Sequence, residues 1–464
     1  MALTFLSVFL IPYGVLCFFK KSNKLLIKSI IFSIPFSATS LINLSSGVPI
    51  TIFQFLTIIL IFRQFIFTLF KGKFFWPIEE RQSINLKLCF IFIFVCILSI
   101  VVPIFIDSNY FVHSTNVEAG YPLVELNFSL SNINRLFPLV VGILFIFIIM
   151  QNKTNLYDLR EYLKVYILSI SFITIWGIFQ YLLWTFGYDY PEFIFNTLNE
   201  DLRVSDSEII SEDGVIRRIY SVTQEPSHFV CFLLSGLPLL YVNHFYGEPL
   251  LPRKFGNLLI FLIILTILIS FSTTGVGGLL IFAFICYVTL HSKNPITLLI
   301  RSLFALIFIL ITTVVLYQVE FIGNFLNLIF LEKLISGSII ERLFFIEKAW
   351  YHFLDYPILG LGMGNVTSSD LLIFLLSNIG IIGTSVFLIL VTNLIISLLK
   401  NKKEIKVSIN SESKYFSLAL IDSILITFYV QMFIYLLMGF VWYLPVFYIM
   451  VVFMISASSK NLYG

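Results

Sequence analysis

The chain has 464 residues, of which 59% are hydrophobic and only 12% charged, and its formal net charge is +3. This charged fraction is about half the roughly 25% of an average soluble domain, which excludes a soluble protein, and the small net charge argues against a nucleic-acid partner. The apolar residues form continuous runs of the length that crosses a hydrocarbon core as a helix, without the alternation of a membrane barrel. We therefore predict an all-α, polytopic integral membrane protein with a single transmembrane domain over residues 1–464.

Taken in chain order, the apolar runs predict about 13 transmembrane helices, within bounds of about 11 to 14. The N-terminal run lacks the basic segment and cleavage site of a signal peptide, so we interpret it as a retained span. The second run contains "SIPFSATSLINLSSG", residues 33–47, which is polar for a span and also compatible with a re-entrant segment. The expected spans lie near residues 3–19, 29–46, 49–70, 86–106, 135–150, 165–187, 228–246, 255–272, 275–290, 297–317, 371–399, 414–436 and 440–457.

The basic residues predict the orientation, because Lys and Arg are retained on the cytoplasmic side of a membrane. Most of the 29 basic residues fall in one alternate set of loops, which we assign to the cytoplasm. The other set then forms the periplasmic face, with long outer loops near residues 107–134, 188–227 and 318–370. The basic residues of the outer side are few: Arg135, Arg203, Arg217, Arg218, Lys333, Arg342 and Lys348.

The cysteines indicate no cofactor. All of them lie inside apolar runs, and their spacing suits neither disulfides nor metal ligation. We expect small buried hydrophobic side chains, no metal and no cofactor. They are Cys17, Cys89, Cys96, Cys231 and Cys286.

Glu225 precedes Pro226 at the expected start of a span, within "RRIYSVTQEPSHF", residues 217–229. Proline suits the first helical turn and disfavours helical angles at the residue before it, so Glu225 is expected at the helix cap, beside the positive end of the helix dipole. Its role stays open between a general base for a hydroxyl acceptor, an anchor for an arginine, and a structural cap. Arg217 and Arg218 match phosphate oxygens bidentately, which favours binding of a lipid-linked pyrophosphate; the alternative is a solvated loop pair.

The third outer loop contains a predicted helix. Glu341, Lys348, His352 and Asp355 follow one another at intervals of 7, 4 and 3 residues, which places them on one helix face. We expect this helix to lie in the outer membrane interface. Arg342 stands near its start, within reach of a phosphate at the bilayer surface.

Two glycine-rich stretches complete the pattern. "GLGMG", residues 360–364, predicts a flexible turn, but it lacks the strand and the lysine of a P-loop. "STTGVGG", residues 272–278, interrupts an apolar run, and glycines and hydroxyls in spans commonly serve helix packing.

Together these segments resemble the O-antigen polymerase and ligase superfamily, membrane glycosyltransferases of the GT-C type, over roughly residues 130–400. One shared feature is an arginine-containing outer loop that leads into a span, and another is the interruption "STTGVGG". The element "QEPSHF", residues 224–229, resembles a corner of Wzy-type polymerases rather than of ligases. A later family pattern is matched here by Arg342, Trp350, Pro357, Gly360, Gly362, Gly364 and Asn365.

The resemblance implies a GT-C-like polymerase of the bacterial inner membrane with its active site facing the periplasm. Its donor and acceptor would be undecaprenyl-pyrophosphate-linked glycans, which it joins into O-antigen or a related surface polysaccharide. Arg217 or Arg218, with Arg342, would hold the donor pyrophosphate, so that the reaction needs no metal. Membrane lipids are expected as further partners, and the resemblance alone implies a chain-length regulator protein.

The base of the reaction is less defined than the arginines. Ligase-like members often carry a His and an Asn after the glycine-rich turn, where this chain has Ser369 and Asp370. A histidine base therefore does not transfer to that place. The candidate bases, in order of preference, are Glu225, Asp370, His228 and His352.

Two other functions remain open. An O-antigen ligase would use the same donor and transfer the polymer to lipid A core. A lipid-linked oligosaccharide flippase or other transporter would place ionisable groups near the bilayer midplane, for which only Arg63 and Asp422 are candidates here.

Overall fold

The computed structural model describes most of the chain and is mainly helical. The predicted span near 297–317 and the first part of the third outer loop lie outside the described residues. These residues are 2–20, 22–43, 49–71, 80–106, 109–113, 121–128, 130–151, 155–198, 208–211, 214–291, 337–408, 412–439 and 444–459.

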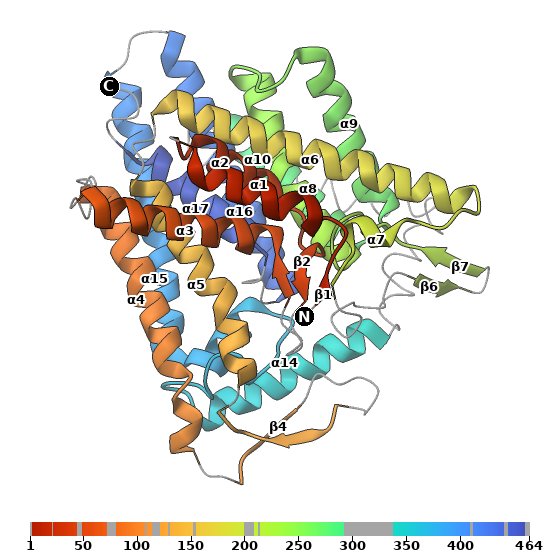
Figure 1. Cartoon of the computed structure of the whole chain (residues 1–464), viewed down its shortest axis with the longest axis vertical. Helices are drawn as coiled ribbons and strands as arrows, with labels where there is room; N and C mark the ends of the chain where they lie inside the picture. The colour runs from red at the N-terminus through yellow and green to blue at the C-terminus, as the bar shows by residue number, and fades with distance from the viewer. Residues whose placement is uncertain are drawn as a thin grey trace.

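Within these ranges, eight helices are long and apolar enough to cross a membrane (Figure 1). Two shorter apolar helices, α1 (Ser7–Phe19) and α17 (Val446–Ala457), accompany them. The protein is therefore a multi-pass, predominantly α-helical membrane protein, as the composition predicts. The eight helices are α3 (Ile52–Lys71), α4 (Glu80–Ser99), α5 (Leu130–Gln151), α6 (Leu156–Thr185), α8 (Pro226–Tyr246), α10 (Thr273–His291), α15 (Leu371–Ser408) and α16 (Glu412–Met438).

Helix α8 forms the centre of the bundle. It packs against α6, α9 (Arg253–Ile269), α10 and α16, and 83% of its apolar window is buried. A helix that is apolar on all sides, as α8 is, has no face suited to water and is stabilised by such surroundings. Because Glu225 immediately precedes α8, the candidate corner is attached to the most buried of the eight candidate spans.

The expected span near 29–46 is not a single helix. Helix α2 (Lys24–Ser33) ends early, and the chain continues through Pro35 into strand β2 (Ser40–Asn43). Pro35 has no backbone N–H with which to continue the helical hydrogen bonds, and the serines and threonine that follow compete for backbone hydrogen bonds. Strand β2 pairs antiparallel with β1 (Ala2–Leu3) and β3 (Pro49–Thr51), so this polar segment is extended where a helix was expected.

Helix α15 is broken at Gly380, where φ is 63° and ψ is −169°. A Cβ atom at this position would collide with the carbonyl of Ile358, so glycine is required. The backbone groups at the break are satisfied by residues 357–362, because Leu361 N donates to Ser377 O at 2.8 Å and Ile381 N donates to Pro357 O, also at 2.8 Å. An unbroken helix of 38 residues would be about 57 Å long, well beyond a hydrocarbon core of about 30 Å.

The outer loops carry short secondary structure that the all-α prediction did not include. Strands β4 (Phe111–His113) and β5 (Leu123–Glu125) form one hairpin, and β6 (Glu208–Ser211) and β7 (Gly214–Arg217) form another. Helix α7 (Glu192–Phe195) is a single turn in the second predicted outer loop, and the 3-10 helix η1 (Val102–Phe105) is a single turn at the end of the predicted span 86–106.

The helix predicted in the third outer loop is present as α14 (Gly337–Asp355). Figure 1 shows it, in cyan, running across the end of the bundle beside β4 instead of parallel to α4. A small separate core joins it to the first outer loop and to the glycine-rich turn. Its buried members are Val112, Leu126, Ala349, Leu361 and Val366.

Candidate functional site

The site is built from the corner before α8. Glu225 has extended angles, with φ −149° and ψ 162°, and Pro226 occupies the first helical position, as the sequence predicts. In the described part of the chain, the Glu225 side chain makes no capping bond to the helix amides. Instead its Oε1 accepts a hydrogen bond from Ser227 Oγ and lies 3.2 Å from Nε2 of His228. The carboxylate is thus directed at functional groups and not at the helix end.

Two arginines from different loops act on this carboxylate. Burial raises the pKa of Glu225, whereas the charge of His228 and the hydrogen bond from Ser227 lower it. The guanidinium groups of Arg342 and Arg218 lower it as well, and the net pKa of Glu225 lies below its usual value. Arg342 also interacts electrostatically with His228. The structure therefore places Arg218 and Arg342 within electrostatic range of the Glu225–His228 pair, and the Glu225 carboxylate is ionised at neutral pH.

The two adjacent arginines have different surroundings. Arg218 is 6% exposed and precedes the loop that leads to Glu225. Arg217 is exposed and ends strand β7, in register with Glu208. A buried guanidinium is held in a fixed position with little competing water, so Arg218 is the better placed of the pair to bind an anion.

The loop between β7 and α8 is anchored to α6 by Gln180. The Gln180 Oε1 accepts from Tyr220 N at 3.1 Å and from Ser221 N at 2.7 Å. Ser221 itself has a positive φ of 53°, and its Oγ donates to Ile173 O at 2.9 Å. The Tyr190 hydroxyl donates to Ser221 O at 2.7 Å. Gln180 is not among the residues predicted from the sequence, although a lone amide inside an apolar run is a recognisable signal.

His352 lies in a different cluster. The single Tyr110 hydroxyl proton is donated to Asp355 Oδ2 at 2.7 Å, so His352 Nδ1, 2.8 Å from the same oxygen, is the donor of the second bond. Burial and the charges of His113 and Lys348 lower the pKa of His352. Ten residues separate it from Arg342, which is about 15 Å along a helix. Its observed contacts are with the first outer loop and not with Glu225.

Asp370 caps α15. Its Oδ1 accepts from Ile373 N at 2.9 Å, the usual geometry of an aspartate before a helix. The backbone N–H of Asp370 donates to Ser368 Oγ at 3.3 Å. At least one of the carboxylate oxygens is therefore committed to the helix end.

The glycine-rich turn is satisfied from within the protein. Asn378 Oδ1 accepts from Gly364 N at 2.9 Å and from Val366 N at 3.2 Å. Arg135 Nη1 donates to Gly364 O at 2.5 Å, and Asn132 Nδ2 donates to Asn365 Oδ1 at 2.6 Å. Arg135, another outer arginine, therefore supports this turn and not the Glu225 corner.

The stretch "STTGVGG" serves helix packing. A Cβ at Gly275 would press on Ile267 of α9 and Val230 of α8, and one at Gly278 would collide with Leu234 of α8. The packing interpretation is therefore confirmed for these glycines. Among the described residues, no three His, Cys, Asp or Glu side chains gather to hold a metal ion.

Fold and site define a multi-pass helical membrane protein with a carboxylate–imidazole pair and two guanidinium groups at one end of a buried helix. The chain matches no known protein-family model, and no functionally characterised protein matches it in sequence. The resemblance to a glycosyltransferase superfamily consequently depends on the motifs themselves and on their arrangement.

Proposed function

We propose that the protein is a membrane glycosyltransferase that polymerises undecaprenyl-pyrophosphate-linked repeat units into O-antigen or a related surface polysaccharide at the periplasmic face of the bacterial inner membrane. The observation that carries the proposal is the convergence of Arg218 and Arg342 on the Glu225–His228 pair. Two guanidinium groups offset the charge of a pyrophosphate, and an ionised carboxylate beside them accepts a proton.

In this reaction an acceptor hydroxyl of the incoming repeat unit attacks the anomeric carbon of the donor glycan. The new C–O bond forms as the bond from that carbon to the pyrophosphate oxygen breaks. Arg218 and Arg342 stabilise the negative charge that develops on the departing undecaprenyl pyrophosphate. Glu225 takes the hydroxyl proton, and His228 and Ser227 hold the carboxylate in place.

The transporter alternative gains no support from its two candidate residues. Arg63 Nη1 donates to Cys17 O at 2.6 Å, where it satisfies the end of α1. Asp422 is paired with Lys402. Both groups therefore have structural roles, whereas a transporter is expected to use intramembrane ionisable groups on its substrate pathway.

The test is deletion of the gene in its host, followed by gel analysis of the lipopolysaccharide. We expect core that carries one repeat unit. Bare core with polymer stranded on the carrier lipid would indicate the ligase, and the loss of surface repeats would indicate a flippase. Complementation with Arg218→Ala and Arg342→Ala separately is expected to fail, whereas Arg217→Ala, the matched neighbour, restores the polymer. Full complementation by all three variants contradicts the assignment of the arginines.

A further inference from the structure

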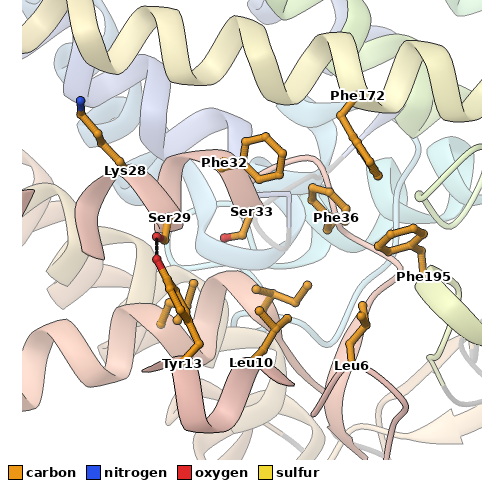
Figure 2. A pocket seen from close by; sticks show the side chains of 12 residues that line it. Leu6, Leu10, Tyr13, Lys28, Ser29, Phe32, Ser33, Phe36, Phe172 and Phe195 are labelled. Carbon is orange, nitrogen blue, oxygen red and sulfur yellow. Dashed lines mark hydrogen bonds between the residues drawn. The ribbon is translucent and has the colours of Figure 1, made fainter. Parts of the chain in front are cut away.

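An apolar groove lies between α1, α2, α3 and α6, with a volume of about 460 Å³. Figure 2 shows Phe172 projecting from α6 toward Phe36 and Phe195, with Lys28 at the opposite end. Residues on the outer faces of the neighbouring helices, such as Val8 and Ile175, are exposed apolar side chains that face lipid in a membrane protein. Phe32, which lines the groove, is itself exposed, so the groove reaches the lipid-facing surface with an apolar lining.

One end of the groove is an aromatic wall. The ring of Phe36 lies 5.5 Å from that of Phe172 and 5.5 Å from that of Phe195, and Phe172 meets Phe195 edge-on at 5.6 Å. Phe32 remains 37% exposed beside them. Aromatic rings in such contacts are held rigidly and present a large apolar surface to a ligand.

The other end is closed by polar groups that satisfy one another. The Tyr13 hydroxyl and Ser29 Oγ are 2.5 Å apart, as the dashed line in Figure 2 marks. Lys28 Nζ donates to Glu161 Oε2 at 2.8 Å. An occupant gains little by placing a charged head here, because both charges are already paired. Its polar head is therefore expected beyond the aromatic end.

The aromatic end of the groove is hydrogen-bonded to the loop that precedes Glu225. Thr39 Oγ1 donates to Phe195 O at 2.5 Å, and the next residue back, Ala38, donates through its N–H to Val222 O at 3.2 Å. Asn196 Nδ2 donates to Thr223 O, also at 3.2 Å.

The distance between the groove and the loop before Glu225 can be expressed along helix α6. Phe172 faces the groove, and Gln180, which holds the loop before Glu225, follows eight residues later. Eight residues correspond to about 12 Å along a helix. The groove thus ends about two helical turns from the anchor of the arginine-containing loop.

We propose that this groove holds the hydrocarbon tail of the lipid-linked donor while its pyrophosphate reaches Arg218 and Arg342. This inference rests on the proposed function and adds the place where the lipid is bound. Burial of successive apolar groups in the groove contributes affinity that a soluble pyrophosphate sugar lacks.

The experiment compares two donors on the purified full-length protein in nanodiscs, one with a long polyprenyl tail and one with a short tail. Leu10→Trp fills the groove from α1, and Val15→Trp on the lipid-exposed face of the same helix is the matched control. We expect Leu10→Trp to raise KM for the long-tailed donor at least tenfold and to leave the short-tailed donor unchanged. Val15→Trp is expected to change neither. Equal KM values of the two variants for the long-tailed donor contradict lipid binding in the groove.

A second measurement does not depend on the folding of a filled variant. A benzophenone amino acid in place of Phe32 is expected to crosslink the long-tailed donor, and excess unlabelled donor should compete. Crosslinking of phospholipid acyl chains alone contradicts the proposal. A wild-type protein that extends neither donor contradicts the proposed function itself. An active wild type, together with an unchanged KM of Leu10→Trp for the long-tailed donor, contradicts only lipid binding in the groove.

Discussion

Charged side chains make different interactions at the two ends of the helix bundle. At the end assigned to the cytoplasm, basic residues pair one to one with acidic residues from other predicted cytoplasmic loops. Lys24 lies 2.6 Å from Asp158, and Arg160 lies 2.6 Å from Glu248. At the other end, the charges of His228, Arg342 and Arg218 all act on the carboxylate of Glu225.

This difference distinguishes basic residues that orient the protein in the membrane from basic residues that are suited to binding a substrate. Exposed one-to-one pairs contribute little stability and no net charge. At the end assigned to the periplasm, the guanidinium groups of Arg342 and Arg218 lower the pKa of Glu225 from two different loops. Guanidinium groups beside a partly buried carboxylate suit the binding of phosphate oxygens. Contacts also occur among loops of the same predicted side, since Tyr110 of the first outer loop bonds to α14 of the third.

The largest effect is expected for Glu225→Gln. The amide is similar in size but accepts no proton, so we expect polymerisation to fall about 10²- to 10⁴-fold, the contribution usual for a general base. Polymer formed from purified donor and acceptor measures it. The control is Asp370→Asn, which retains a good helix cap and should keep near-normal activity. A larger loss for Asp370→Asn than for Glu225→Gln would exchange the two roles.

Arg342→Ala should reduce turnover about 10²- to 10³-fold, the range for one donor to a developing negative charge. Arg342→Lys is expected to recover part of it, because the charge remains but the bidentate geometry is lost. Arg217→Ala is the matched change at an exposed arginine and should cost less than tenfold. Equal losses for Arg342→Ala and Arg217→Ala would remove the distinction between a converging arginine and a solvated one.

The pH dependence gives a second test of the same cluster. The pKa of Glu225 is held below its usual value by His228, Ser227, Arg342 and Arg218 against the effect of burial. Its carboxylate is therefore ionised at neutral pH, and activity should be lost only when pH falls through this lowered pKa. Residual activity of Arg342→Ala should be lost at a higher pH than that of the wild type. If Arg342→Ala loses activity at the same acidic pH as the wild type, Arg342 does not act on Glu225.

Tyr110→Phe should have a moderate effect. It removes the hydroxyl that bonds His352 and Asp355 but keeps the ring that meets Tyr356 edge-on at 5.2 Å. We expect a loss of about 1–3 kcal/mol of unfolding free energy, typical of hydrogen bonds to charged groups, and less than tenfold in turnover. Thermal unfolding and polymer assays measure both. A loss of turnover comparable with Glu225→Gln would restore His352 as a candidate base.

The smallest effect is expected at the end assigned to the cytoplasm. The side chains of Arg160 and Glu248 are 36% and 57% exposed, so Glu248→Gln should cost at most about 1 kcal/mol and less at high salt. Denaturation at two salt concentrations measures it, with no change in polymerisation expected. A loss of activity here would show that the one-to-one pairs are not only structural.

Local features of the candidate site follow from the sequence. Pro226 determines the start of α8 and the extended angles of Glu225, and the spacing of Glu341, Lys348, His352 and Asp355 predicts α14. The position of Asp370 before an apolar run is likewise the usual signal of a helix cap.

Other features depend on contacts that no local pattern encodes. The polar segment after Ser33 is extended because strands β1 and β3 pair with it. The break in α15 at Gly380 is stable because residues 357–362 satisfy its backbone groups.

The sequence by itself predicts that the protein spans a membrane and that its basic residues gather on one side, because both follow from the cost of placing charged and polar groups in hydrocarbon. Only the tertiary structure decided which outer charges meet. Arg342 acts on Glu225, Arg217 stays exposed, and His352 bonds with Tyr110, although all of them belong to the same face in sequence. The physical reason is that electrostatic coupling depends on distance and burial after folding, and neither quantity is present in a linear pattern.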